Sequence, residues 1–443
     1  MIPAELRCLA TFLAGALSLG AATVSSRTFS RDVWPILEKR CVNCHQTGEI
    51  APMAFTSYKQ VRPWAGAIRE AVISRKMPPW HAESGSAHPF RNDRSLTKAE
   101  IDSVVAWVNA GAPEGEPGRE LAIAPREPDW KLGKPDLVIQ VPGFQVPKTG
   151  PVPYSFLIVP LHLDQDTWIR AAEFRIDQRR VIHHINAFVR APGSSYLAGF
   201  PANQIFVPTV AERAKKRDNE RLFERRQLLL GYEPGYQPMQ WLDSGAKLIK
   251  AGSDLIFEMH YNPNGTEVVD HSEFALYFAK AAPADRVLAV DTLRDLDLTI
   301  PPEDRNCLSK ASMTLARPAR LLSIQPHMHV RGNSMEVKAV YPDGRIEKLL
   351  AVPKYDFNWQ TTYVLAKPLD LPAGTRLESV AGFDNSANNP YNPDPGATVK
   401  WGDQTTSEMH IAFLELVIDA TWDPDTLFQS PAKMLVVPAP DKR

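Results

Sequence analysis

The spacing of apolar residues changes once along the 443-residue chain, and this change limits the folds that the chain can adopt. Between residues 29 and 110 the apolar side chains recur with a spacing near 3.6, which predicts helices. Beyond residue 136 they form short runs of β-branched and aromatic residues bounded by proline and glycine, which predicts strands. We therefore expect a small α domain followed by a larger β part.

Three segments carry the helical pattern, at residues 32–39, 61–74 and 97–109. The third begins with a capping box, because Thr97 is followed three residues later by Glu100. Gly111 is suited to end this helix, since glycine readily adopts the left-handed conformation found after helix C-termini.

The strand pattern occurs at residues 137–141, 154–159, 255–261, 274–278, 321–324, 335–340 and 411–417. Its spacing is typical of β-sandwiches, and the 39 prolines agree with many loops and sheet edges. A charged, helix-like insert at residues 210–226 interrupts the strands, and the corner at Ile300, Pro301 and Pro302 marks the expected boundary between two β domains.

The N-terminal segment has the pattern of a secretory signal peptide. Arg7 precedes an apolar run at residues 8–24, and small residues at 20–22 precede Ser25. We expect cleavage near Ala22 and a protein that is periplasmic or otherwise exported. The alternative is an uncleaved anchor, because such a run is at the short end for spanning a bilayer. A membrane is an expected partner only in that case.

The overall charge indicates no polyanionic partner. Lysine and arginine together number 50, and aspartate and glutamate 51. No field of one sign therefore attracts the chain to nucleic acid, and we expect no nucleic-acid partner.

The motif C-V-N-C-H at residues 41–45 matches the c-type haem attachment sequence. In that motif the two thiols, here Cys41 and Cys44, form thioethers to the haem, and the histidine, here His45, binds the iron. The alternatives are a chance match and a redox dithiol, and both are disfavoured by the surrounding helical pattern.

The second axial ligand of such a haem is expected about thirty residues further on. Met77 is the best candidate, because Pro78 and Pro79 hold the following loop extended. Met53 and His81 are the alternatives. An iron with one histidine and one methionine ligand suits electron transfer.

Five further histidines lie in strand-like segments: His183, His184, His260, His327 and His329. The spacing of His327 and His329 places both imidazoles on one face of a regular strand, as two ligands of one metal require. His183 and His184 would point to opposite faces, so sharing a metal needs a bulge or a strand end there. Taken singly, each pair is more often structural than metal-binding.

From about residue 135 to 417 the chain resembles the copper type II, ascorbate-dependent monooxygenases, the family of peptidylglycine alpha-hydroxylating monooxygenase and dopamine beta-monooxygenase. That family has an H-H pair and a later histidine for one copper, then an H-x-H and a methionine for the other. The resemblance implies that His183, His184 and His260 hold an electron-storing copper. It implies an oxygen-activating copper at His327, His329 and Met409, the last in T-S-E-M-H at residues 406–410.

The resemblance also implies a fold of two jelly-roll-like β-sandwiches, each bearing one copper across a water-filled cleft. A thioether favours Cu(I), the form that meets oxygen, so Met409 would mark the catalytic copper; otherwise Met409 would be assigned to core packing. Two departures matter. Gln325 stands where peptidylglycine enzymes have a carboxylate-binding arginine, and the family's disulfide framework is missing, since Cys307 is the remaining cysteine of this region.

The expected fold class is multidomain, a small all-α cytochrome c-like domain followed by two β-sandwich copper domains. The expected segments are a signal peptide (1–26), a haem domain (27–112), a linker (113–135) and two copper monooxygenase-like β-sandwiches (136–299 and 300–443).

The expected activity is that of a copper-dependent monooxygenase, an oxidoreductase with two coppers and one covalent haem c per chain. It would hydroxylate a small organic or peptide-like substrate with O2. Electrons would come through the haem from an external donor, either an ascorbate-like reductant or another cytochrome. The alternative is a non-catalytic copper and haem protein that transfers electrons or binds metal.

Overall fold

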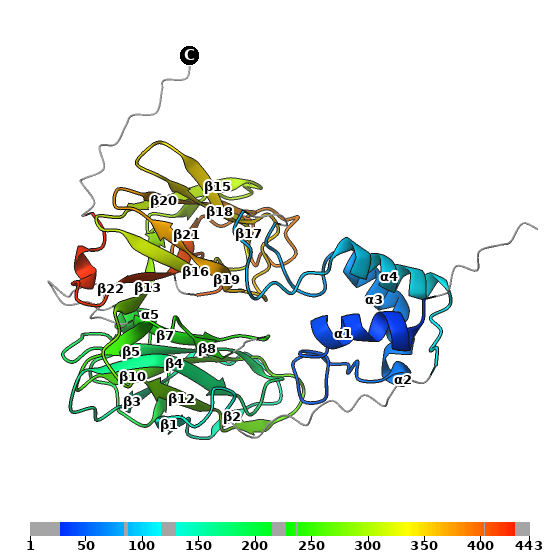
Figure 1. Ribbon diagram of the computed structural model, residues 1–443, viewed down its shortest axis with the longest axis horizontal. Coiled ribbons are helices and arrows are strands. Elements are labelled where there is room, and N and C mark those ends of the chain that lie inside the picture. The colour runs from blue at the N-terminus through cyan, green and yellow to red at the C-terminus, as the bar shows by residue number, and fades with distance from the viewer. Residues whose placement is uncertain are drawn as a thin grey trace, which may run out of the picture.

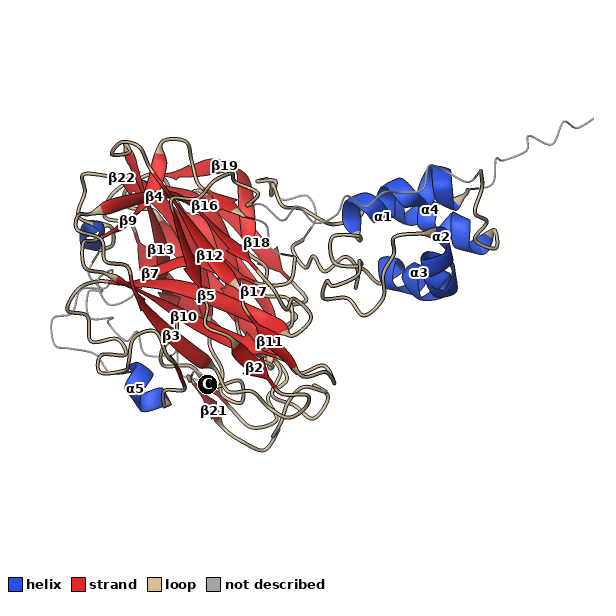
Figure 2. Cartoon of the chain, turned by 90° about the horizontal axis from the view of Figure 1, so that it is seen from below, coloured by secondary structure: helices blue, strands red, loops and turns tan. Residues whose placement is uncertain are grey.

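The computed structural model describes residues 27–83, 87–116, 130–214, 227–235, 238–402 and 404–429. The predicted signal peptide and residues 117–129 of the predicted linker lie outside this part. The described chain is mostly β-sheet, with short helices near its N-terminus and strands from residue 137 onward (Figures 1 and 2). Among these residues no helix combines the length and the apolar character that crossing a membrane requires.

The helical part contains η1 (Phe29–Val33), α1 (Trp34–Arg40), α2 (Tyr58–Val61), η2 (Arg62–Trp64), α3 (Ala65–Ile73) and α4 (Lys98–Asn109). The predicted capping box is confirmed: the Glu100 N–H donates to the Thr97 hydroxyl, and the Thr97 N–H donates to the Glu100 carboxylate. Gly111 has a φ of 85°, as expected after a helix end. Fully buried Val61 and Trp107 lie in the small core of this part.

The strands up to residue 278 form what we call the first β body. They are β1 (Leu137–Gln140), β2 (Phe144–Val146), β3 (Ser155–Pro160), β4 (Thr167–Arg175), β5 (Ile182–Arg190), β6 (Ile205–Phe206), β7 (Gln227–Tyr232), β8 (Met239–Gln240), β9 (Gly245–Ile249), β10 (Asp254–Tyr261), β11 (Val268–Asp270) and β12 (Glu273–Phe278). Helix α5 (Val210–Ala214) begins the predicted charged insert, and residues 215–226 lie outside the described part.

The later strands form the second β body. They are β13 (Asp285–Arg294), β14 (Thr299–Ile300), β15 (Cys307–Thr314), β16 (Ala319–His327), β17 (Gly332–Val340), β18 (Ile346–Val352), β19 (Tyr363–Leu371), β20 (Arg376–Phe383), β21 (Val399–Lys400) and β22 (Ile411–Asp419), followed by η3 (Pro424–Thr426). Every strand predicted from the sequence overlaps an observed one.

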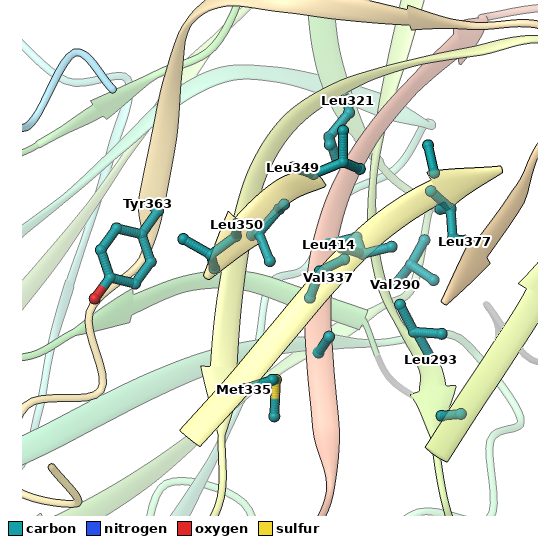
Figure 3. Close-up of a cluster of buried hydrophobic side chains, with 14 of the residues drawn as sticks. Val290, Leu293, Leu321, Met335, Val337, Leu349, Leu350, Tyr363, Leu377 and Leu414 are labelled. Atoms are coloured by element: carbon teal, nitrogen blue, oxygen red, sulfur yellow. The ribbon is translucent and has the colours of Figure 1, made fainter. Parts of the chain in front are cut away.

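One nine-stranded sheet runs through both bodies, in the order β1-β12-β4-β9-β13-β22-β16-β19 with β8 beside β4. In the first body it packs against the five-stranded sheet β6-β3-β10-β5-β7, and in the second against the four-stranded sheet β15-β20-β17-β18. The core of the second body lies between its two sheets, where Leu414 of β22 meets Val337 of β17 (Figure 3).

The two cores lie on opposite faces of the strands that the bodies share. Leu288 and Leu416 belong to the core of the second body, whereas their neighbours Val287 and Val417 belong to that of the first. This alternation follows from the period of two along a strand. Strand β13 therefore serves both cores, and the predicted domain boundary at residue 300 stays a prediction.

The helical part reaches the second body through residues 80–83 and 87–93, which we call the arm. Trp80 packs in the core of that body, with its ring centroid 4.8 Å from that of Tyr363. The Glu83 N–H donates to the Ala351 carbonyl at 2.8 Å, and Phe90 pairs with Leu365. The arm thus adds its own backbone to the second β body.

A buried ion pair lies between the two bodies. Lys247 of β9 is 2% exposed and donates to Glu415 of β22 at 2.8 Å and to the carbonyls of Leu228 and Leu229. Burial by itself would raise the pKa of Glu415, but Lys247 and the bonds from Trp241 and Ser323 bring that pKa below its ordinary value. Glu415 is therefore charged, and its charge depends on Lys247.

Removing one partner of this pair should destabilise the protein strongly. Lys247→Met leaves an uncompensated buried carboxylate, and we expect the free energy of unfolding to fall by about 3–5 kcal/mol, measured by urea denaturation. The double variant Lys247→Met/Glu415→Leu should regain most of that loss.

The exposed pair of Lys98 and Asp102 offers a control, and Lys98→Met should change stability by less than about 1 kcal/mol. If the double variant loses as much stability as the Lys247→Met and Glu415→Leu single variants added together, this ion pair does not couple the two bodies.

Candidate metal centres

Three histidines of the first β body converge at the ends of β5 and β10. His260 lies opposite His184, and Tyr261 lies opposite Ile182, so His183 is the extra residue of a β-bulge. The bulge predicted from the adjacent histidines is confirmed. It turns His183 to the side on which His184 and His260 already lie.

The imidazole nitrogens of this three-histidine cluster are close enough to share one ion. The ring centroids are 5.1 to 5.3 Å apart, and one nitrogen from each ring lies within 4.8 Å of the other two. The Nδ1 atom of His260 is buried and has no hydrogen-bond partner among the residues that the structure describes, which is costly unless it binds a ligand. Tyr154 stacks on the His260 ring at 4.4 Å.

The electrostatics of the three-histidine cluster favour neutral rings, the form that binds metal. Burial, with a smaller contribution from His183, lowers the pKa of His260 to about 4. The pKa of His184 is also well below its ordinary value, first because of burial and then because His183, His260 and His327 are close by. Three converging neutral imidazoles fit a zinc or copper ion.

The second cluster, the histidine pair, lies where β16 ends. His327 is the last residue of the strand and His329 lies beyond it, so the expectation that both occupy one face of a strand is wrong. Their rings nevertheless meet, with centroids 5.4 Å apart. His327 Nδ1 lies 2.6 Å from Gln360 Oε1, and His329 Nδ1 lies 3.1 Å from the Ser407 carbonyl.

These acceptors set the tautomers of the histidine pair. Because the Gln360 and Ser407 oxygens can only accept, each Nδ1 donates, and the lone pair lies on Nε2. A ligating histidine in metal sites commonly has this arrangement, in which the other ring nitrogen donates to a carbonyl or carboxylate. The pair therefore fits a metal bound through Nε2.

Met409 lies in the segment that runs beside His329. Ile411 pairs with His327 across β22 and β16, and the Ser407 carbonyl lies 3.1 Å from His329 Nδ1, so Met409 lies between two residues that contact the histidine pair. Fully buried Glu408 ties the two segments together, because its carboxylate accepts from the backbone N–H groups of His329 at 2.7 Å and of Arg331 at 2.6 Å. The sequence analysis did not single out Glu408. Its position next to Met409 is the feature of the sequence that could have indicated it.

One aromatic ring lies between the two clusters. The ring centroid of Phe357 is 6.0 Å from that of His183 and 6.1 Å from that of His329. Its loop is held by Gln360 at His327 and by Tyr355, whose hydroxyl donates to the Met328 carbonyl at 2.8 Å. The water-filled cleft implied by the resemblance stays a prediction. The structure places the Phe357 ring against one histidine of each cluster, and no sequence pattern indicated this.

The C-V-N-C-H motif follows the C-terminal end of α1. The His45 N–H donates to the Cys41 carbonyl at 2.9 Å, so the motif forms one turn. His45 Nδ1 lies 3.2 Å from the Met53 carbonyl and donates to it, which leaves Nε2 for a ligand bond. Phe55 stacks on the His45 ring at 4.2 Å.

The thiols of this motif do not resemble those of a redox dithiol. Cys41 and Cys44 are both free, and burial, followed by the neighbouring Cys44, raises the pKa of Cys41 to about 12. Burial also raises the pKa of Cys44. Redox dithiols have lowered thiol pKa values instead. The set of two thiols and one oriented histidine fits a covalently attached haem.

The three candidates for the second axial ligand lie in different surroundings. Met77 follows α3, and its N–H donates to the Ala71 carbonyl. The Met53 carbonyl accepts a hydrogen bond from His45, so the Met53 backbone lies on the same side as His45. Met53 is therefore the weaker candidate. His81 lies in the arm, where burial lowers its pKa and Asp356 opposes that shift. Met77 stays a prediction.

Gln325 and His410 lie next to the histidine pair and Met409 in the sequence and have hydrogen-bond partners of their own. Gln325 donates to the Gln360 carbonyl at 2.8 Å and so helps to hold the loop of Phe357. His410, the residue after Met409, is fully buried between the hydroxyls of Ser309 and Ser379, at 2.7 and 2.9 Å.

No protein-family model and no curated protein matches the chain. Among solved structures, a T=1 particle derived from infectious bursal virus aligns over 67% of this chain and 72% of its own, with 10% identity and a TM-score of 0.19. The VP2 subviral particle of infectious bursal disease virus covers 66% of this chain and 74% of its own, with 9% identity and a TM-score of 0.19. Allantoicase covers 55% and 81%, with 11% identity and a TM-score of 0.17. Similarity this low carries no information about function.

Proposed function

We propose that this chain is an exported copper-dependent monooxygenase that hydroxylates a small organic or peptide-like substrate with O2. An external reductant, ascorbate-like or another cytochrome, would supply electrons through a c-type haem on the helical part. One observation carries the proposal: the ring of Phe357 lies against one histidine of each of two imidazole clusters, one on each β body. Two separate one-electron metals are what such a reaction needs, because it consumes two electrons beyond those of the substrate.

The assignment of the three domains belongs to the same proposal. Residues 27–112 would be a cytochrome c-like domain, and residues 136–299 and 300–443 would be two jelly-roll-like copper domains. The mostly β architecture with short N-terminal helices supports this assignment.

Each cluster has a donor set suited to its proposed role. His183, His184 and His260 offer imidazoles alone, which suit copper in both oxidation states. His327 and His329 with Met409 add a thioether, which favours Cu(I). When bound, the two coppers would store and deliver the electrons for hydroxylating a C–H bond.

The surrounding residues orient the donors and control access to them. Gln360 and the Ser407 carbonyl hold the rings of the histidine pair, and Glu408 keeps the Met409 segment against His329. The Phe357 ring lies against one histidine of each cluster and would limit access to the space between them. At the other site, Cys41, Cys44 and His45 would hold the haem, with Met77 as the second iron ligand.

Metal analysis of purified protein tests the proposal most directly. We expect two coppers and one haem iron per chain. His260→Ala should lose the copper of the three-histidine cluster, because it removes one of three ligands. Met409→Ala should keep Cu(II) but bind Cu(I) more weakly, because the thioether is lost; competition with a Cu(I) chelator measures this.

His271→Ala is the matched control, since His271 is exposed and lies outside both clusters. Wild-type protein with one copper or none would instead favour a non-catalytic copper and haem protein. Equal copper content and unchanged absorption in the His260 and Met409 variants would count against these ligands.

Haem attachment can be tested separately. With Cys41→Ala and Cys44→Ala together, the haem should be extracted by acidified organic solvent, whereas the wild-type chain should retain it. Cys307→Ala is the control and should leave the haem attached, because Cys307 lies in β15 of the second body. Haem that resists extraction after both changes would refute the assignment.

Phe357→Ala should open the space between the clusters. Without the ring, water and small anions can enter, and azide should bind to the copper-loaded protein several-fold more tightly, as measured by its charge-transfer absorbance. Phe413→Ala is the control, because in the described part of the chain that ring contacts His327 at 5.7 Å and no histidine of the other cluster. An unchanged azide affinity in the Phe357 variant would show that this ring does not limit access.

A further inference from the structure

A chain of hydrogen bonds crosses the second β body beside Met409, and His410 is its central member. His410 Nδ1 lies 2.7 Å from the hydroxyl of Ser309 in β15, and its Nε2 lies 2.9 Å from the hydroxyl of Ser379 in β20. The Ser309 hydroxyl in turn donates to Asp295 at 2.7 Å. The imidazole therefore ties the segment before β22 to two neighbouring strands of the four-stranded sheet.

The Asp295 carboxylate sets the direction of these hydrogen bonds. Because a carboxylate can only accept, the Ser309 proton is used there, and the Ser309 oxygen accepts from His410 Nδ1–H. In the neutral ring, Nε2 then carries the lone pair and accepts from the Ser379 hydroxyl. Both ring nitrogens thus have a partner, and a satisfied buried network of this kind orders the residues that it joins.

The network is sealed from solvent. His410, Ser379 and Ser309 are 0%, 1% and 4% exposed, so water does not compete for their hydrogen bonds. The Asp295 N–H also donates to the His410 carbonyl at 3.2 Å. The backbone of His410 is therefore held as well as its ring.

Glu408 holds the chain on the other side of Met409. The Glu408 N–H donates to the Lys400 carbonyl at 3.2 Å, and the Glu408 carbonyl accepts from the Gly402 N–H at 3.1 Å. Its carboxylate accepts from the His329 N–H at 2.7 Å. Met409 is thus a half-buried residue between two fully buried, hydrogen-bonded neighbours.

A methionine ligand depends on its backbone for its placement. The unbranched side chain has three rotatable bonds, so by itself it specifies no single position for the sulfur. We propose that His410 is a positioning residue: its hydrogen bonds across the second β body keep the Met409 thioether within reach of a copper at the histidine pair. This inference rests on the copper part of the proposed function and needs neither the haem nor the three-histidine cluster.

The Cu(I) affinity of the full chain, measured by competition with a Cu(I) chelator, tests this inference. The parent chain carries His260→Ala, so that copper at the three-histidine cluster does not add to the signal. In this parent, His410→Ala should weaken Cu(I) binding about tenfold, a typical effect of losing a residue that orients a metal ligand. Cu(II) binding should not change, because both histidines of the pair remain.

X-ray absorption of the Cu(I) protein gives a second readout. The parent should show sulfur scattering from the Met409 thioether, and His410→Ala should weaken that scattering. His410→Asn, whose amide can still donate to Ser309, should recover part of the affinity. Ser379→Ala removes one hydrogen bond and keeps the ring, so it should weaken Cu(I) binding by a smaller factor, and it replaces His410→Ala if that variant does not fold.

Two comparisons separate positioning from a general loss of stability. With Met409 already replaced by alanine, His410→Ala should weaken Cu(I) binding no further, because the thioether that it positions is gone. Ser272 of the first body is the matched control, since it is fully buried and its hydroxyl donates to Asp270 at 2.8 Å. Ser272→Ala should leave the Cu(I) affinity unchanged.

The outcomes distinguish this inference from the proposed function. If the His410 and Ser379 variants keep the parent's Cu(I) affinity and sulfur scattering, or if they weaken Cu(I) binding equally with and without Met409, the inference is overturned while the copper assignment stands. A parent without sulfur scattering, whose Cu(I) affinity is unchanged by Met409→Ala, would overturn the ligand assignment as well.

Discussion

The strands β13, β22 and β16 contribute side chains to the cores of both β bodies, and the relative placement of the two histidine clusters depends on this arrangement. Their alternate side chains enter the cores of the two β bodies, and the charged pair of Lys247 and Glu415 lies in the seam between them. Close-packed interiors transmit strain and resist sliding. The two bodies therefore keep one relative position, and with it the distance between the three-histidine cluster and the histidine pair.

Both clusters form where strands end, since a regular strand cannot present neighbouring side chains to one point. A bulge at His183 solves this problem in the first body. In the second body the chain leaves β16 after His327, and hydrogen bonds from Gln360, Ser407 and Glu408 order the segment beyond it. These supports come from the 353–362 loop and the segment before β22, so the histidine pair exists only in the folded second body.

The helical part is attached to both bodies, to the second through the arm and to the first through Glu49. The arm residue Asn92 donates to the Thr362 carbonyl at 2.7 Å and accepts from the Val364 N–H at 3.0 Å, next to the loop that carries Phe357. Arg179 makes the second attachment, at Glu49. The proposed haem site and the proposed copper sites are thus held in one frame, which suits electron transfer over fixed distances.

The sequence by itself determined the helices, the strands, the capping box at Thr97 and the need for a bulge at His183, because these follow from local periodicity and side-chain chemistry. It also selected the histidines that converge. The tertiary structure decided what lies around them. Phe357, Glu408 and Arg179 carry no local pattern, since their importance comes from contacts with residues far away in the chain. The sequence also did not show that one sheet runs through both bodies. A strand buried on both faces appears in the sequence as an apolar run, whichever core each face packs against.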